Sequence, residues 1–218
     1  MSRPSCALDH LVVAADTLDQ GAAYIAAKLG IAPADGGRHA QLGTYNRVLK
    51  LGGDRYLEVI AIDPAGVQPD FPRWFDLDNP VLQASLKSRP RLVAWVARTH
   101  AVDSMAAEFY GRPMIVRPMQ RGDLRWRFAF TIDGKLPAGG LIPYLIQWEA
   151  DRHPTALMTD SGRELEGLDG VHGEAAAVRQ RIASMGLGDA ITVHPAVRRQ
   201  LPSLSARIRT PAGVVVLD

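Results

Sequence analysis

The sequence contains very little cysteine: Cys6 is the single one among 218 residues. One cysteine excludes an internal disulfide framework, and this usage is typical of a protein kept in a reducing compartment. Long apolar runs are also missing, since none approaches the roughly 20 residues of a membrane-spanning helix. The first ten residues contain no apolar signal core either. We therefore expect a cytoplasmic protein without a membrane partner.

The sequence also has no large excess of positive or negative charge. The 25 Lys and Arg residues nearly balance the 23 Asp and Glu residues, and the basic residues form no block. Nucleic-acid binding needs clustered positive charge, so no nucleic-acid partner is expected. The segment GLDGVHG lacks the lysine and the spacing of a P-loop, and the sequence contains neither G-x-G-x-x-G nor the G-x-S-x-G of serine hydrolases. A nucleotide cofactor is therefore not predicted.

The sequence does contain a repeated order of predicted elements. In the first unit we expect a strand over 8–14, a helix over 17–30 with Asp16 as its N-cap, an extended segment over 43–51 and a strand over 55–62. The order returns in segments 91–99, 100–111, 113–119, 124–132 and 144–149, and more weakly in 163–173, 174–186, 190–197, 203–210 and 213–218. The pattern predicts an α+β chain with modules at 1–65 and 91–155, a crossover at 66–90 with a short helix, and a divergent third unit at 156–218.

The first unit carries a family resemblance. Its LDHLVVA strand, the helix that ends in LG and the closing YLEVIA resemble the vicinal oxygen chelate superfamily, and GGRHAQLGTYNRVLKLGGDRYLEVIAIDP resembles its glyoxalase-like domain proteins. This resemblance implies repeated β-α-β-β-β modules whose curved mixed sheets surround a cavity. It also implies one divalent metal ion (Zn, Ni, Mn or Fe), held by a histidine on the first strand and a glutamate on the last. His10 and Glu58 fall on these positions.

The residue chemistry agrees with a metal site. Imidazole and carboxylate together bind borderline and hard divalent ions and leave positions open for a substrate with adjacent oxygens. Strand alternation places Glu58 on one face with two apolar neighbours, and Asp9 on the face opposite His10. The alternatives are a core histidine at His10 and a salt bridge at Glu58. His39, in the glycine-rich loop before the second strand, is a third candidate as metal ligand, substrate contact or structural residue.

Further residues are candidates for substrate binding and proton transfer. Asn46 and Thr44 follow the glycine-rich loop, and the second unit offers Trp95, Gln147 and Arg127. Trp95 is otherwise sheet core, and Arg127 is otherwise part of a solvated outer face. His153 and Glu149, near the end of the second unit, are candidates for moving a proton.

Two functions stay open at this point. The first is a metal-dependent enzyme with isomerase- or lyase-type chemistry on a small molecule. Iron-dependent ring cleavage is less favoured, because the second unit has neither histidine nor carboxylate near Val93 and Ile146, where its own ligands would stand. The alternative is a metal-free protein that binds or sequesters a small molecule, as antibiotic-resistance proteins do. Either is compatible with a homodimer.

Overall fold

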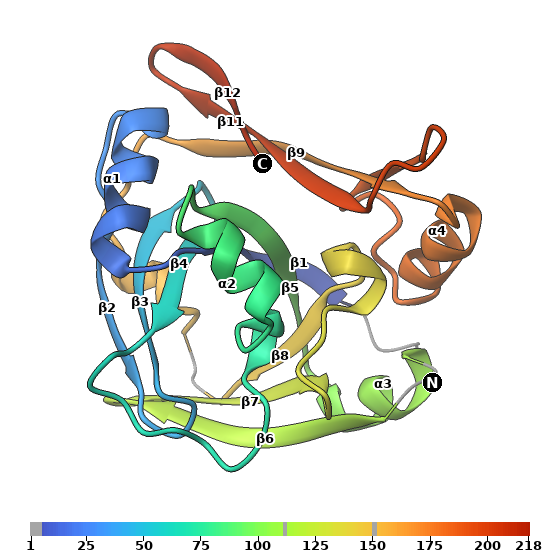
Figure 1. Cartoon of the computed structure of the whole chain (residues 1–218), viewed down its shortest axis with the longest axis horizontal. Helices are drawn as coiled ribbons and strands as arrows, with labels where there is room; N and C mark the ends of the chain where they lie inside the picture. Colours follow the sequence, from blue (N-terminus) through green and yellow to red (C-terminus); the bar gives the residue numbers. More distant parts are fainter. Residues whose placement is uncertain (1–5, 111–112, 150–151) are drawn as a thin grey trace.

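The computed structural model describes residues 6–110, 113–149 and 152–218, and its largest feature is an eight-stranded mixed sheet curled into a half-barrel (Figure 1). The strand order is β2-β3-β4-β1-β5-β8-β7-β6. The strands are β1 (Cys6–Ala14), β2 (Ala34–His39), β3 (Thr44–Lys50), β4 (Tyr56–Ile62), β5 (Arg91–Thr99), β6 (Met114–Arg121), β7 (Leu124–Thr131) and β8 (Tyr144–Trp148). Each half of the sheet comes from one β-α-β-β-β module, as expected, and the halves meet where β1 pairs antiparallel with β5.

The two modules have one helix each on the outer side of the sheet. The helices are α1 (Leu18–Leu29) and α3 (Val102–Phe109). α1 begins at Thr17, whose side chain accepts a hydrogen bond from the backbone of Gln20, so the N-cap is Thr17 and not Asp16. It ends at Gly30, which adopts the left-handed conformation that glycine tolerates best. No helix among the described residues is long and apolar enough to cross a membrane.

The central strand β1 is covered on both faces, because side chains alternate between two separate apolar clusters. Leu11 and Val13 belong to the cluster under α1, α3 and the C-terminal elements. Val12 and Ala14 belong to the cluster on the concave face. The crossover, with α2 (Pro80–Leu86) and the short helix η1 (Trp74–Asp76), supplies the side chains that cover the concave face.

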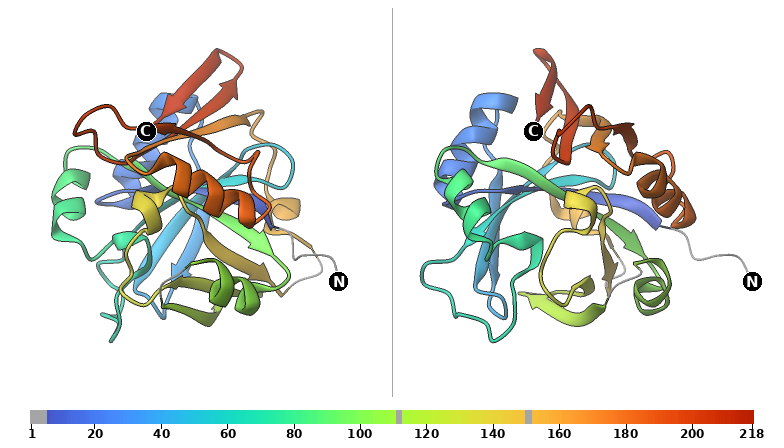
Figure 2. Two further views of the ribbon diagram at one scale, coloured as in Figure 1. Left: turned by 90° about the vertical axis from the view of Figure 1, so that its right-hand side faces the viewer. Right: turned by 45° about the vertical axis from the view of Figure 1, so that its right-hand side comes forward.

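The chain after residue 156 forms a second, four-stranded sheet that packs across the outer side of the half-barrel (Figure 2). Its elements are β9 (Glu164–His172), α4 (Ala175–Ser184), β10 (Thr192–Pro195), β11 (Ser203–Thr210) and β12 (Gly213–Leu217). The elements follow the predicted order, but the strand order β10-β9-β11-β12 differs from that of the two modules. The third unit therefore adds an outer layer and does not extend the half-barrel.

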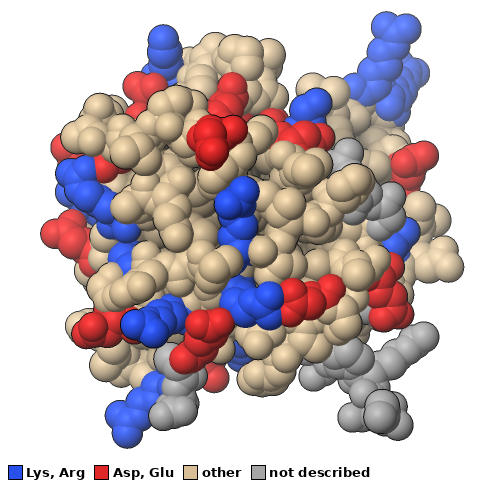
Figure 3. All heavy atoms as spheres, turned by 90° about the horizontal axis from the view of Figure 1, so that it is seen from below, with Lys and Arg blue, Asp and Glu red and all other residues tan. Residues whose placement is uncertain are grey.

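Acidic and basic side chains are mixed on the face seen from below in Figure 3. This mixed charge agrees with the near balance of the two signs in the sequence.

Candidate functional site

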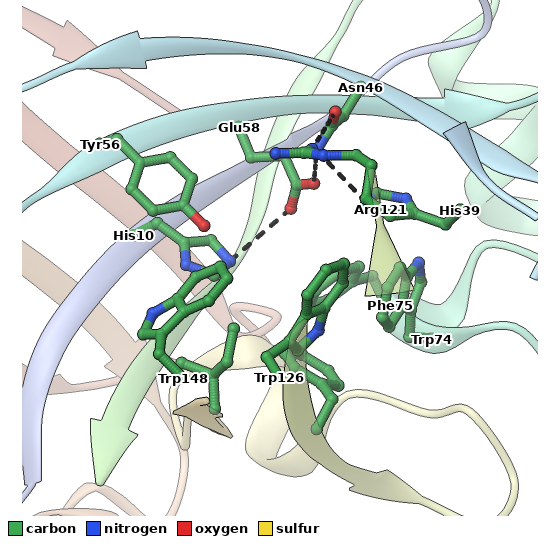
Figure 4. A pocket seen from close by; sticks show the side chains of 12 residues that line it. His10, His39, Asn46, Tyr56, Glu58, Trp74, Phe75, Arg121, Trp126 and Trp148 are labelled. Carbon is green, nitrogen blue, oxygen red and sulfur yellow. Dashed lines mark hydrogen bonds and ion pairs between the residues drawn. The ribbon is translucent and has the colours of Figure 1, made fainter. Parts of the chain in front are cut away.

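A small cavity lies on the concave face of the curled sheet, beneath the crossover (Figure 4). Its free volume is about 20 Å³, which is room for one ion or one water molecule. The side chains that line it come from both modules and the crossover: His10, His39, Asn46, Tyr56, Glu58, Trp74, Phe75, Arg121, Trp126, Phe128, Ile146 and Trp148. The cavity thus has a polar wall and an aromatic wall. The polar wall consists of His10, His39, Asn46, Glu58 and Arg121, and the aromatic wall consists of Trp74, Phe75, Trp126, Phe128 and Trp148.

A β-bulge brings Asp9 into the site. The register between β1 and β5 shifts between Leu8 and His10, which makes Asp9 the extra residue of β1. The side chain of Asp9 is completely buried and contacts His10, although alternation placed these two side chains on opposite faces. The bulge is the physical reason, because it interrupts the alternation on which that prediction relied.

Asp9 accepts hydrogen bonds from three side chains. Its Oδ1 lies 2.6 Å from Nδ1 of His10. Its Oδ2 lies 2.9 Å from Nε2 of His153 and 3.0 Å from Nε1 of Trp148. Burial alone would raise the pKa of Asp9, but the hydrogen bonds from His10 and His153 hold this pKa below its ordinary value. Asp9 is therefore an ionised, fully partnered buried carboxylate.

The contact with Asp9 sets the tautomer of His10. An ionised carboxylate accepts a hydrogen bond from the N–H at Nδ1, so a neutral His10 presents the lone pair of Nε2 on its other side. That nitrogen faces Oε2 of Glu58 across 3.7 Å (Figure 4). The ring of Tyr56 stacks on His10 with 4.5 Å between the centroids and fixes the plane of the imidazole. In this neutral form of His10, two lone pairs face each other in the cavity, too far apart for a hydrogen bond.

Asn46 lies between the negative and positive groups of the polar wall. Its Nδ2 donates to Oε1 of Glu58 at 2.5 Å, and its Oδ1 accepts from Nη1 of Arg121 at 2.7 Å. Arg121 reaches this position from the end of β6, across the gap between the two edge strands. Glu58 and Asn46 are both at most 5% exposed, so the contacts are shielded from water.

His39 is a neutral member of the polar wall. Its Nδ1 lies 3.0 Å from the hydroxyl of Thr44, and its ring meets Trp74 edge-on. Burial, followed by the positive charge of Arg121, lowers the pKa of His39 to about 3. The segment around His39 was expected to be a loop, but it forms the edge strand β2 with a bulge at Gly36.

The structure brings four predicted site residues into the cavity: His10, Glu58, His39 and Asn46. Thr44 lies behind them, where its hydroxyl contacts His39. His153 touches the site through Asp9.

The other four predicted site residues lie away from this cavity. Trp95 belongs to the outer core, where its indole donates to the carbonyl of Leu141. The side chain of Gln147 accepts from the backbone of Val102 at the start of α3. Arg127 pairs with Asp103 on the outer face, because alternation along β7 turns Trp126 and Phe128 inward. Glu149 is exposed just past β8.

Sequence analysis missed several residues of the site. Arg121 could not be found, since its contact with Asn46 joins the edge strand β6 to β3, and the two residues are 75 positions apart in the chain. Trp74 lies in the segment FPRWF of the crossover, whose aromatic content was the available indication. Ile146 stands in the cavity near where the second module would need a carboxylate.

The polar wall fits a divalent ion in part. Two ligands bound to one ion at about 2.0–2.2 Å lie about 3.0–3.5 Å apart, so His10 and Glu58 at 3.7 Å need to move by only a few tenths of an ångström. Across the three described ranges, no group of three His, Cys, Asp or Glu side chains is placed to hold an ion. The remaining ligands would therefore be water, substrate or neutral side chains.

Comparisons with known proteins agree with this architecture. A half-barrel built from two β-α-β-β-β modules is the fold of the vicinal oxygen chelate superfamily. The sequence profile of the glyoxalase-like domain family matches residues 8–186, and the chain belongs to this family.

Among solved structures, a hypothetical protein from Staphylococcus aureus is similar, with a TM-score of 0.58, 13% identity, and coverage of 97% of this chain and 84% of that chain. This similarity supports the fold alone. Methylmalonyl-CoA epimerase from Mycobacterium tuberculosis is similar with a TM-score of 0.42 and 19% identity, over 68% of this chain and 91% of that chain. A Streptomyces coelicolor methylmalonyl-CoA epimerase in complex with 2-nitronate-propionyl-CoA has a TM-score of 0.43 and 20% identity, over 68% of this chain and 98% of that chain. No curated protein matches the sequence.

Proposed function

We propose that this protein is a metal-dependent enzyme that acts on a small molecule with adjacent oxygens, by isomerase- or lyase-type chemistry. The observation that carries the proposal is the pair of His10 and Glu58, whose Nε2 and Oε2 face each other across 3.7 Å. Two lone pairs directed at one another in a buried cavity repel unless a proton or a cation lies between them. A divalent ion bound by both would polarise the two substrate oxygens as a Lewis acid.

The surrounding residues support this role by fixing both ligands. Asp9 fixes the tautomer of His10, in the way that second-shell carboxylates orient metal-binding histidines. Asn46 holds Oε1 of Glu58 and leaves Oε2 free to face His10. His153 lies behind Asp9 at 2.9 Å, so we assign it a positioning role through that carboxylate.

His39 is proposed as a substrate contact and not as a metal ligand. Its Nδ1 is engaged with Thr44, and its Nε2 faces Nδ2 of Asn46 at 3.5 Å. Since burial keeps its pKa near 3, His39 is neutral at physiological pH and can exchange a hydrogen bond with a polar substrate atom.

The test is a calorimetric titration of Mn²⁺, Ni²⁺ and Zn²⁺ into protein freed of metal with a chelator. We expect about one ion per chain, and at least about a tenfold loss of affinity in His10→Ala and in Glu58→Gln. His100→Ala, which changes an exposed histidine, is the matched control. Equal affinity in all four proteins would contradict the proposal.

A second candidate function is metal-free binding of a small molecule. It is favoured by the aromatic wall, where Trp126 and Trp148 lie 5.5 Å apart, and by the limited number of charged ligands near His10. On this account His10→Ala leaves ligand affinity nearly unchanged. An ion that binds to the wild type but not to the variants decides in favour of the enzyme.

A further inference from the structure

We propose that the ligand of this cavity carries a carboxylate or an equivalent oxyanion, and that Arg121 binds it and determines this specificity. The inference deepens the proposed function, on which it rests for the location of the site. It starts from the position of Arg121, which lines the cavity beside Asn46 and Glu58 (Figure 4).

The guanidinium of Arg121 has more N–H donors than its hydrogen bond to Asn46 uses. Within the described part of the chain, its hydrogen-bond partner is the neutral Oδ1 of Asn46, and no carboxylate lies within ion-pair distance. Arg73 and Arg127, by contrast, each pair with an aspartate. A guanidinium has five N–H donors in a planar fork that matches an oxyanion. A partly buried cation without an acidic partner is stabilised by an anionic ligand.

The edge strand β2 is shaped to let Arg121 enter. A Cβ on Gly37 would lie 2.7 Å from Cδ of Arg121, and a Cβ on Gly36 would lie 2.1 Å from Oδ1 of Asn46. Gly37 also has a φ of +156°, which side-chain-bearing residues rarely adopt. The two glycines therefore leave space where the Arg121–Asn46 contact crosses the strand.

Asn46 keeps Arg121 and Glu58 from pairing with each other. Its amide accepts from the arginine on one side and donates to the carboxylate on the other. Glu58 thus remains available to an ion beside His10, and Arg121 remains available to an anion. A ligand with adjacent oxygens at one end and an oxyanion at the other matches this arrangement of charges.

The indole N–H of Trp74 adds a further donor. Trp74 is 3% exposed and lines the cavity, and its Nε1 is one of two buried side-chain polar atoms without a partner among the described residues. A buried N–H without a partner costs stability, and an acceptor on a ligand would recover that cost. The free volume of about 20 Å³ limits the ligand to a compact one, such as a short 2-oxo acid, and even that ligand enters only if lining side chains move apart.

The test compares pyruvate with pyruvamide, its neutral amide, as probes in calorimetric titrations. We expect the wild type to bind pyruvate about tenfold more tightly, since one charge-assisted hydrogen bond contributes on this scale. Arg121→Met should remove the preference, while Arg125→Met, on the exposed outer face of β7, should keep it. Equal binding of both probes by the wild type, an unchanged preference in Arg121→Met, or no detectable binding of pyruvate would overturn the inference.

The same titrations with and without metal separate this inference from the proposed function. A pyruvate preference that depends on Arg121 in metal-free protein that also binds no ion supports the anion site and rejects the metal enzyme. An ion that binds through His10 and Glu58 without any pyruvate preference gives the opposite result. Near-native circular dichroism of Arg121→Met shows that the variant is folded.

Discussion

Asp9 and His10 are adjacent in the chain, yet their side chains are hydrogen-bonded to each other in the interior, with 2.6 Å between Oδ1 and Nδ1. Neighbouring side chains of a regular strand point to opposite faces, so this contact depends on the bulge in β1. The contact fixes the tautomer of His10 and directs Nε2 toward Glu58. The predictions below concern the groups that maintain this geometry.

Replacing Asp9 with Asn should weaken both folding and metal binding. The amide keeps one acceptor oxygen, so its NH2 group must face either the N–H of His10 or the N–H groups of His153 and Trp148, and the donors on that side lose their acceptor. A buried donor without a partner costs about 1–3 kcal/mol, and the loss of an orienting carboxylate lowers metal affinity about 10- to 100-fold. Urea unfolding and metal titration measure the two effects. Asp54→Asn, at an exposed aspartate, should change neither.

Stability should decrease as the pH falls from 6.5, because folding holds His39 neutral. Its pKa drops from 6.5 to about 3 in the folded state, so between these values the unfolded chain binds a proton that the folded chain does not. The free energy of unfolding is therefore highest above pH 6.5 and declines by about 1 kcal/mol per pH unit below it. The lowered pKa of Asp9 adds to the loss only below about pH 4.

Urea unfolding at pH 7, 6 and 5 measures this decline. His39→Gln should flatten it, whereas His100→Gln at an exposed position should leave the slope as it is. The same slope in His39→Gln and in the wild type would show that another group is responsible.

Gly36→Ala should destabilise the edge of the site. The added Cβ would lie 2.1 Å from Oδ1 and 2.9 Å from the backbone oxygen of Asn46. Overpacking of this kind costs about 1–3 kcal/mol. Gly173→Ala, whose Cβ meets nothing within 4 Å, should stay within about 0.5 kcal/mol of the wild type. Similar midpoints of thermal unfolding for the two variants would show that β2 can shift without cost.

Arg163→Ala should loosen the second sheet from the first module. Nε and Nη2 of Arg163 donate to the carbonyl of Leu29 at the end of α1, at 2.9 and 2.8 Å. Losing these bonds should cost about 1–3 kcal/mol, because the carbonyl is left without its charged donor. Arg209→Ala, at an exposed ion pair, should cost less than about 1 kcal/mol. Hydrogen exchange of β9 amides reports whether the sheet opens separately in the first variant.

The sequence predicted the class of the fold, because the repeated order of elements and the family resemblance both depend on patterns that are local in the chain. Alternation placed Glu58 on one face of its strand together with two apolar neighbours, and the structure turns Glu58 into the cavity. The repeated order of elements predicts two modules. Alternation failed at Asp9, because a bulge depends on pairing with β5. It also could not decide between the two faces of β7, since either Arg127 or Trp126 could have turned inward.

Contacts between residues far apart in the chain could not be predicted from the sequence. Arg121 enters the cavity only because the sheet curls until β6 approaches β2, and no local pattern encodes that curl. The strand order of the second sheet is another example, since its elements repeat the order seen in the modules but pair differently. The division of the chain at 1–65, 66–90, 91–155 and 156–218 stays a prediction.

The most direct measurement of the central claim is anomalous diffraction from crystals of this protein equilibrated with Mn²⁺ or Zn²⁺. The account predicts one anomalous peak between Nε2 of His10 and Oε2 of Glu58, about 2.0–2.2 Å from each atom. The peak should be absent in crystals of Glu58→Gln. A peak elsewhere, or none between these two atoms at saturating metal, would contradict the account.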